Sequence, residues 1–267
     1  MPTLLLLSLL VLLPFWAQAG IALSQSRLIY QHGEIEHSLL IANSNPYPIL
    51  VQLWVDDGQG NLERQLPASG VPFLSTTPIF NLQAEERRMV RILYNQMPMP
   101  QDRESMYWLN LYEVPLSSHG EQPPLDTDYR LSIAMNTQIK LFYRPAALQS
   151  DPQTHLKALR CTLKRSSLRW QVVCDNPTPY YFSITEVAVQ ADGKSYPALP
   201  QADMTIAPVA LKRYPLPQLP DSVIGSGVTL RFVSINDQGQ RFRHARVLPI
   251  APVMRPTRRD VRAEDDR

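Results

Sequence analysis

LSIAMNTQIKLFY, residues 131–143, is the stretch of sequence that decides the fold. Its odd-numbered residues are apolar or aromatic except for Thr137, and an apolar period of two predicts a β-strand. Thirteen residues at about 3.3 Å each span about 43 Å, whereas strands typically have about 5–6 residues. We therefore expect one unusually long strand, whose first part, residues 131–135, projects beyond the core of its own domain.

The sequence in front of this strand offers nothing that clearly covers the projecting part. Residues 116–130 read LSSHGEQPPLDTDYR, a mostly polar stretch that contains two prolines. A strand edge that carries apolar side chains is an aggregation hazard unless another strand pairs with it. Two interpretations remain at this point: a long strand that bends across a large sandwich, or a strand that binds a partner by β-augmentation.

The rest of the chain repeats the period of two, and helical periodicity is weak throughout. Alternating runs occur at 49–55, 168–173, 183–189 and 230–234, with turn signals about 8–12 residues apart. Asn-Pro-x-Pro occurs both at 45–48 and at 176–179, which suggests a duplicated unit. The pattern predicts an all-β chain of two immunoglobulin-like β-sandwich domains, 20–147 and 148–254, divided near the stretch RPAALQSDP.

The two ends of the chain differ from this pattern. Residues 4–16 are almost wholly apolar but too short for a membrane span, which needs about 20 residues. Ala17-Gln18-Ala19 then fits a signal-peptidase site, although no Lys or Arg precedes the apolar run. We expect residues 1–19 to be a signal peptide, the mature chain to be exported without membrane insertion, and residues 255–267, RPTRRDVRAEDDR, to be a disordered tail.

Export changes how the two cysteines are interpreted. Cys161 and Cys174 are nearly symmetric about the polar turn 164–167, as expected for facing residues of a hairpin. In an oxidising compartment a disulfide is the expected state, and it would contribute about 3 kcal/mol in the chain-entropy model. Two free thiols or a metal pair are the alternatives, but no His lies beside either cysteine.

The composition argues against two large classes of function. The net charge of +2 provides no strong basic field, so we expect no binding to nucleic acid. The chain has only 10 glycines but 25 prolines, which disfavours a phosphate-binding enzyme fold that needs glycine turns. None of the five histidines lies in a G-x-S-x-G or H-E-x-x-H motif. Asp56-Asp57-Gly58 is typical of a turn rather than a calcium loop. We expect no enzyme, cofactor or metal site.

Several blocks of sequence, taken in their order and spacing, resemble the periplasmic chaperones of the chaperone–usher pilus pathway, the PapD-like family. The resemblance covers roughly residues 20–252, and the strongest block, Ile139–Pro145, ends the long strand. The other blocks are Ser26–Tyr30, Asn45-Pro46, Val51–Asp56, Phe73, Thr77–Leu82, Arg88–Ile92, Asp102–Ser105, Trp108–Pro115 and Asn176–Tyr181. The resemblance implies two immunoglobulin-like domains in a bent, boomerang arrangement with an interdomain cleft.

The resemblance also implies a partner and a binding mode. The partner would be a pilin, or fimbrial, subunit that lacks its last strand, and the chaperone would fill the gap with Leu131, Ile133 and Met135. Arg27 and Lys140 would hold the terminal carboxylate of the subunit. Lys140 has the opposite parity from the donor residues, so a bulge near 136–138, or a cleft that wraps both faces, would be needed.

The family further has an interdomain ion network, whose positions correspond here to Glu113, Arg144 and Asp237. The implied function is periplasmic: to bind and fold pilin subunits by donor-strand complementation and to deliver them to an outer-membrane usher. The exposed strand also leaves open a self-capping homodimer. The alternative is a secreted immunoglobulin-like adhesion or carbohydrate-binding module, which would share the signal, strands and disulfide but would need neither the carboxylate anchor nor the apolar strand.

Overall fold

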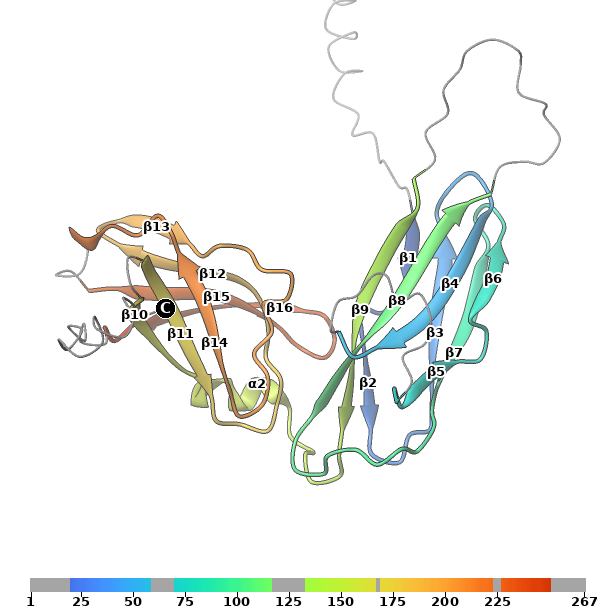
Figure 1. The fold of residues 1–267 in the computed structure, drawn as a ribbon, viewed down its shortest axis with the longest axis horizontal. Helices are drawn as coiled ribbons and strands as arrows, with labels where there is room; N and C mark the ends of the chain where they lie inside the picture. The colour runs from blue at the N-terminus through green and yellow to red at the C-terminus, as the bar shows by residue number, and fades with distance from the viewer. Residues whose placement is uncertain (1–19, 59–69, 117–132, 167–168, 223–226, 251–267) are drawn as a thin grey trace, which may run out of the picture. The chain divides into compact units, whose positions relative to one another are not determined.

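The computed structural model describes residues 20–58, 70–116, 133–166, 169–222 and 227–250 (Figure 1). Its described elements are strands apart from one short helix, α2 (Pro152–His155), and the 3-10 helix η1 (Leu156–Ala158). The all-β class predicted from the sequence is therefore confirmed.

The chain forms two compact units. Among the described residues, unit 1 contains 20–25 and those of Ile35–Met97 and Tyr107–Lys140, whereas unit 2 contains Ser26–Glu34, Pro98–Met106 and those from Leu141 to 250. Two short segments from the first part of the chain thus group with unit 2. The units do not coincide with the sequence ranges 20–147 and 148–254, which stay a prediction.

Strands β1 to β9 build two sheets. One sheet has the order β1-β3-β7-β5 and the other has the order β2-β9-β8-β4-β6. The strands of the first are β1 (Ile21–Leu23), β3 (Glu36–Asn43), β7 (Arg87–Tyr94) and β5 (Phe73–Ser75). Those of the second are β2 (Arg27–Gln31), β9 (Met135–Arg144), β8 (Ser105–Pro115), β4 (Ile49–Asp56) and β6 (Ile79–Leu82).

Alternation along these strands creates one buried face on each sheet. Leu39 and Ile41 of β3 are completely buried, as are Ile49 and Val51 of β4, while the residues between them are partly exposed. Val, Ile and Leu at every second position give this pattern because successive side chains of a strand point to opposite faces. The run expected at 49–55 is therefore confirmed as a strand.

Strands β10 to β16 build two further sheets within unit 2. Their orders are β10-β11-β14 and β13-β12-β15-β16. Trp170, Phe182 and Tyr214 are among the bulkiest side chains of their common core, and each is at most 2% exposed. The strands are β10 (Arg160–Ser166), β11 (Arg169–Asn176), β12 (Ser183–Ala191), β13 (Lys194–Pro197), β14 (Ala210–Leu216), β15 (Thr229–Ile235) and β16 (Arg241–Val247).

The hairpin of β10 and β11 carries the disulfide predicted from the cysteine spacing. Cys161 and Cys174 face each other in the antiparallel register and are bonded. The polar turn expected at 164–167 was placed too early, because β10 continues to Ser166. Residues 167–168 lie outside the described residues.

The long strand is shorter at its start than the sequence predicted. β9 begins at Met135 and ends at Arg144, whereas the expected strand ran from 131 to 143. Ile133 and Ala134 are described but are not assigned to a strand, and Leu131 lies outside the described residues. Apolar alternation alone therefore overestimated the length of the strand. It shows which side chains could lie on a buried face, but not whether the chain itself supplies a neighbouring strand.

An asparagine at the end of a strand organises the turn that follows it in each unit. Nδ2 of Asn43 donates to the carbonyl of Tyr47 and its Oδ1 accepts from the backbone N–H of Asn45, at 2.9 Å each. Asn176 repeats both contacts, with Tyr180 at 2.7 Å and Thr178 at 3.0 Å. The duplication suggested by Asn-Pro-x-Pro thus has a structural counterpart, but the equivalent of Asn176 is Asn43 rather than Asn45.

Candidate functional site

The odd-numbered side chains of β9 form a single row with two very different environments. Ile139, Leu141 and Tyr143 are 7%, 0% and 3% exposed. Met135, in contrast, is 47% exposed, and Ile133 just before the strand is 61% exposed. The apolar row thus leaves the core of the protein and continues into solvent, where two large apolar side chains are available to a partner.

The even-numbered side chains of the same segment lie on the opposite face and contact β8. Asn136 Nδ2 and Gln138 Nε2 both donate to Oδ1 of Asn110, at 3.3 and 2.6 Å. Two donors that share one acceptor must lie on one face of the strand. Side chains therefore alternate regularly between the two faces through 136–138. A bulge in this stretch was one of the two expectations from the sequence.

Lys140 continues this even-numbered row. Its Nζ lies 5.0 Å from the centroid of the Trp108 ring, a distance typical of a cation–π contact. The ring of Trp108 is in turn backed by the turn after β4, because a Cβ at Gly58 would lie 2.4 Å from the indole. The ammonium group of Lys140 thus lies on the face of β9 opposite to Met135.

Arg27, the other predicted anchor residue, is buried in unit 2. Its Nη1 donates to Oγ of Ser183 at 3.1 Å and to the carbonyl of Ile235 at 3.5 Å, while its Nε has no hydrogen-bond partner among the described residues. Burial lowers the pKa of the guanidinium, and Asp237 partly offsets this effect. A buried guanidinium with an unpaired N–H is well suited to donate a hydrogen bond to a carboxylate. Arg27 belongs to unit 2, whereas Lys140 belongs to unit 1.

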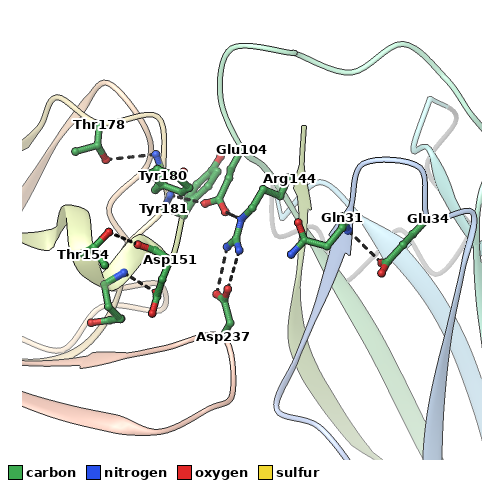
Figure 2. A network of polar contacts seen from close by, with 11 residues as sticks. Gln31, Glu34, Glu104, Arg144, Asp151, Thr154, Thr178, Tyr180, Tyr181 and Asp237 are labelled. Atoms are coloured by element: carbon green, nitrogen blue, oxygen red, sulfur yellow. Dashed lines mark hydrogen bonds and ion pairs between the residues drawn. The ribbon is translucent and has the colours of Figure 1, made fainter. Parts of the chain in front are cut away.

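An ion network surrounds Arg144, the last residue of β9 (Figure 2). Its Nε donates to Glu104 Oε1 at 2.7 Å, and its two terminal nitrogens contact the carboxylate of Asp237 at 2.8 and 3.3 Å. The second oxygen of Glu104 accepts from the backbone N–H of Tyr181 at 2.7 Å. Arg144 is 5% exposed and Glu104 3%, so the pair is shielded from water and neutralised by direct contact.

This network corrects one residue of the prediction. Arg144 and Asp237 are brought together as expected, but the second carboxylate is that of Glu104 and not that of Glu113. Glu113 lies on the part of β8 that belongs to unit 1, where it accepts a hydrogen bond from the backbone N–H of Ile21. Burial raises the pKa of Glu113, and its Oε2 has no partner among the described residues.

Glu104 was missed although its sequence block had been noticed. Glu104 belongs to the block Asp102–Ser105, which leads into β8, whereas the family resemblance points to Glu113. Burial raises the pKa of Glu104, an effect that Arg144 counteracts. The signal in the sequence is an acid directly before a long strand, since such a position brings the side chain to the end of the sheet.

Two family models match the chain and together cover most of it. Residues 20–149 match the model described as pili and flagellar-assembly chaperone, PapD N-terminal domain. Residues 155–246 match the model described as pili assembly chaperone PapD, C-terminal domain. This chain belongs to the PapD-like family of pilus-assembly chaperones.

Individual relatives agree with this membership of the PapD-like family. The chain is 37% identical to the probable fimbrial chaperone LpfB of Escherichia coli O157:H7 over 221 residues, 82% of this chain and 84% of LpfB. It is 35% identical to the probable fimbrial chaperone YadV of Escherichia coli K12, over 67% of this chain and 72% of YadV. Among solved structures, the SafB chaperone of Salmonella enterica in complex with the SafA pilin matches with a TM-score of 0.66 and 27% identity, over 86% of this chain and 97% of that one.

Membership of a PapD-like family decides between the functions left open by the sequence. It favours the chaperone over the adhesion or carbohydrate-binding module, because the matches extend over both halves of the chain and are to chaperones. Within the residues that the structure describes, none of the helices has the length and apolar character that crossing a bilayer requires.

Proposed function

We propose that this PapD-like protein is a periplasmic chaperone that binds pilin subunits, completes their fold with β9 and delivers them to an outer-membrane usher. The observation that carries the proposal is the apolar row that leaves the core at Ile139 and becomes exposed at Met135 and Ile133. A subunit that lacks one strand would bury these side chains, and each buried side chain would contribute about 1.5–3 kcal/mol before ordering costs. Leu131 would extend the same row.

Arg27 and Lys140 are the proposed anchor for the terminal carboxylate of the subunit. Arg27 supports this role through its unpaired Nε, and Lys140 through its place next to the projecting part of β9. A charged anchor would also set the register, because a shift by one residue would exchange the apolar row for the polar one. The family relation to SafB, which was solved with the SafA pilin, supports this type of partner.

The remaining sequence predictions fit the same proposal. Residues 1–19 would direct export to the periplasm, and the two domains would be residues 20–147 and 148–254. The protein would act without catalysis or cofactor, since the folding of the subunit supplies the free energy. The network of Glu104, Arg144 and Asp237 would stabilise the region where β9 ends.

The test is co-purification with a tagged fimbrial subunit that lacks a strand, expressed in the same periplasm. Wild type is compared with Arg27→Ala and Lys140→Ala, and Arg91→Ala serves as a control because its ion pair with Glu36 lies on the surface. We expect both anchor variants to lose capture by at least about tenfold and the control to retain it, since loss of one partner of a buried charge pair costs about 2–5 kcal/mol. Full capture by the folded anchor variants would refute the anchor, and no capture by wild type would refute the chaperone function.

A further inference from the structure

The projecting half of β9 has few apolar contacts to hold it extended. Met135 and Gln138 are exposed along it, and so is Ile133 just before it. β9 is hydrogen-bonded to β8 in the sheet, but a strand segment with little apolar burial should still tend to fray and should then have to be ordered when a partner binds. Side-chain contacts with β8, added to the backbone pairing, would therefore help to keep residues 135–138 in place.

The side chain of Asn110 makes two such contacts with this segment. Asn110 lies in the middle of β8 and is 1% exposed. Its Oδ1 accepts from Gln138 at 2.6 Å and from Asn136 at 3.3 Å, and both donors come from the projecting half of β9. The contact with Gln138 is the shorter one, and it leaves the odd-numbered apolar row on the other face untouched.

Asp56 determines which end of the Asn110 amide faces β9. Oδ2 of Asp56, the last residue of β4, accepts from Nδ2 of Asn110 at 2.8 Å. Oδ1 of the same carboxylate accepts from the backbone N–H of Gly58 at 2.8 Å, so that the carboxylate is held by the turn. A carboxylate can only accept, and the amide nitrogen of Asn110 must therefore point to Asp56 and its oxygen to β9. The result is a directed chain of hydrogen bonds from β9 through β8 to β4.

We infer that Asn110 is a positioning residue, which holds the projecting half of β9 extended and in register before any partner arrives. It does so through Gln138 and Asn136, with its own orientation set by Asp56. Because Asn110 binds the polar face of the strand, the apolar side chains of Ile133 and Met135 on the other face stay available to a partner. For its consequence on subunit capture this inference rests on the proposed function, whereas the order of the strand can be tested on the free chain.

The first test is amide hydrogen exchange of the free mature protein. Gln138→Ala removes the shortest contact at an exposed position, and Asn110→Ala removes the shared acceptor; Asn81→Ala, at an exposed position of β6 in the same sheet, is the matched control. We expect exchange at 135–140 to be about tenfold faster in both test variants and unchanged in the control. A tenfold change corresponds to the loss of about 1.4 kcal/mol, which is what one net hydrogen bond contributes. If Gln138→Ala exchanges like wild type at 135–140, or if exchange rises equally over the whole sheet, the positioning role is wrong.

The second test uses pH, to which a simple packing role would not respond. Asn110→Asp keeps an acceptor for Gln138 but places a second carboxylate against Asp56. The other charged groups nearby are Asp57, which follows β4, and Lys140 on β9. The ammonium group of Lys140 contacts the Trp108 ring. At neutral pH the two carboxylates repel each other and the segment should loosen. On acidification one of them takes up a proton and can donate to the other, so protection at 135–140 should return at a pH above the ordinary carboxyl range. A loss of protection that does not depend on pH would contradict the directed chain.

The third test measures capture of a strand-deficient fimbrial subunit. We expect Gln138→Ala to weaken capture about tenfold and Asn81→Ala to leave it unchanged. Capture by the Gln138 variant equal to that of wild type, with faster exchange at 135–140, would show that the order of the strand has no consequence for binding and would overturn that half of the inference. Absence of capture by wild type would instead overturn the proposed function, while the exchange and pH results would still decide the role of Asn110.

Discussion

The two halves of β9 share one sequence pattern and have opposite surroundings. From Ile139 to Tyr143 every second side chain is buried in the protein, whereas Met135 and the preceding Ile133 are about half exposed or more. The difference teaches that an apolar period of two specifies which face of a strand is apolar, but not which molecule covers that face. In the second half the chain covers itself, and in the first half a partner is proposed to do so.

The largest expected effect concerns Arg144, where the buried half ends. Arg144→Ala removes the cation from Glu104, which is 3% exposed, and leaves an uncompensated buried carboxylate. We expect a loss of about 3–5 kcal/mol in the free energy of unfolding, measured by chemical denaturation. Arg91→Ala is the control and should cost no more than about 1 kcal/mol, because its ion pair is exposed. Equal stability of the two variants would show that the network does not stabilise this end of β9.

A matched pair of substitutions tests the two halves directly. Leu141→Ala empties a completely buried position and should lower the free energy of unfolding by about 2–5 kcal/mol. Met135→Ala removes an exposed side chain of the same row and should change it by less than about 0.5 kcal/mol. Subunit capture should respond in the opposite way, since only Met135 contributes to the surface offered to a partner. A large loss of stability in Met135→Ala would erase the distinction between the halves.

Gly58 connects the turn after β4 to the even-numbered row. It has a φ of +73°, and a Cβ there would lie 2.4 Å from the indole of Trp108. Gly58→Ala should therefore cost about 1–3 kcal/mol and displace the ring on which Lys140 lies. Tryptophan fluorescence and thermal unfolding measure both effects, and Gly33→Ala is the control, because its φ is also positive but nothing lies within 4 Å of its Cβ. If both variants lose the same stability, backbone strain alone explains the loss and the contact with Trp108 contributes nothing.

The smallest expected effect is on the pH dependence of stability. Burial raises the pKa of Glu104 in the folded state above its value in the unfolded chain. As the pH falls through the folded pKa, the folded state takes up a proton before the unfolded state does. This group therefore adds stability as the pH falls toward the unfolded pKa and removes it as the pH rises. Denaturation curves between about pH 7 and pH 4.5 should show this contribution in wild type and not in Glu104→Gln, and identical pH profiles would contradict the direction of the shift.

Much of the fold was predictable from the sequence for simple physical reasons. Alternation identified β4, β11, β12 and β15, because most residues at every second position of each strand are buried. The facing of Cys161 and Cys174 followed from hairpin symmetry, since antiparallel partners are equidistant from the turn. Local patterns of this kind depend on residues that are close in the sequence, and they can therefore be recognised from the sequence alone.

The parts that escaped prediction depend on contacts between distant residues. The choice of Glu104 over Glu113 as the partner of Arg144 rests on a separation of 40 residues along the chain. The role of Asn110 arises from one acceptor shared by two side chains of another strand. The start of β9 at Met135 depends on which neighbouring strands exist. None of these features leaves a periodic trace in the sequence.

Hydrogen exchange along β9, measured with and without a strand-deficient pilin subunit, tests the central claim most directly. The account predicts that amides at 133–137 gain protection on binding, because the subunit supplies the missing neighbour, and that amides at 139–144 are protected in both states. Unchanged exchange at 133–137 in a complex that has demonstrably formed would contradict it, since the subunit would then bind elsewhere on the protein.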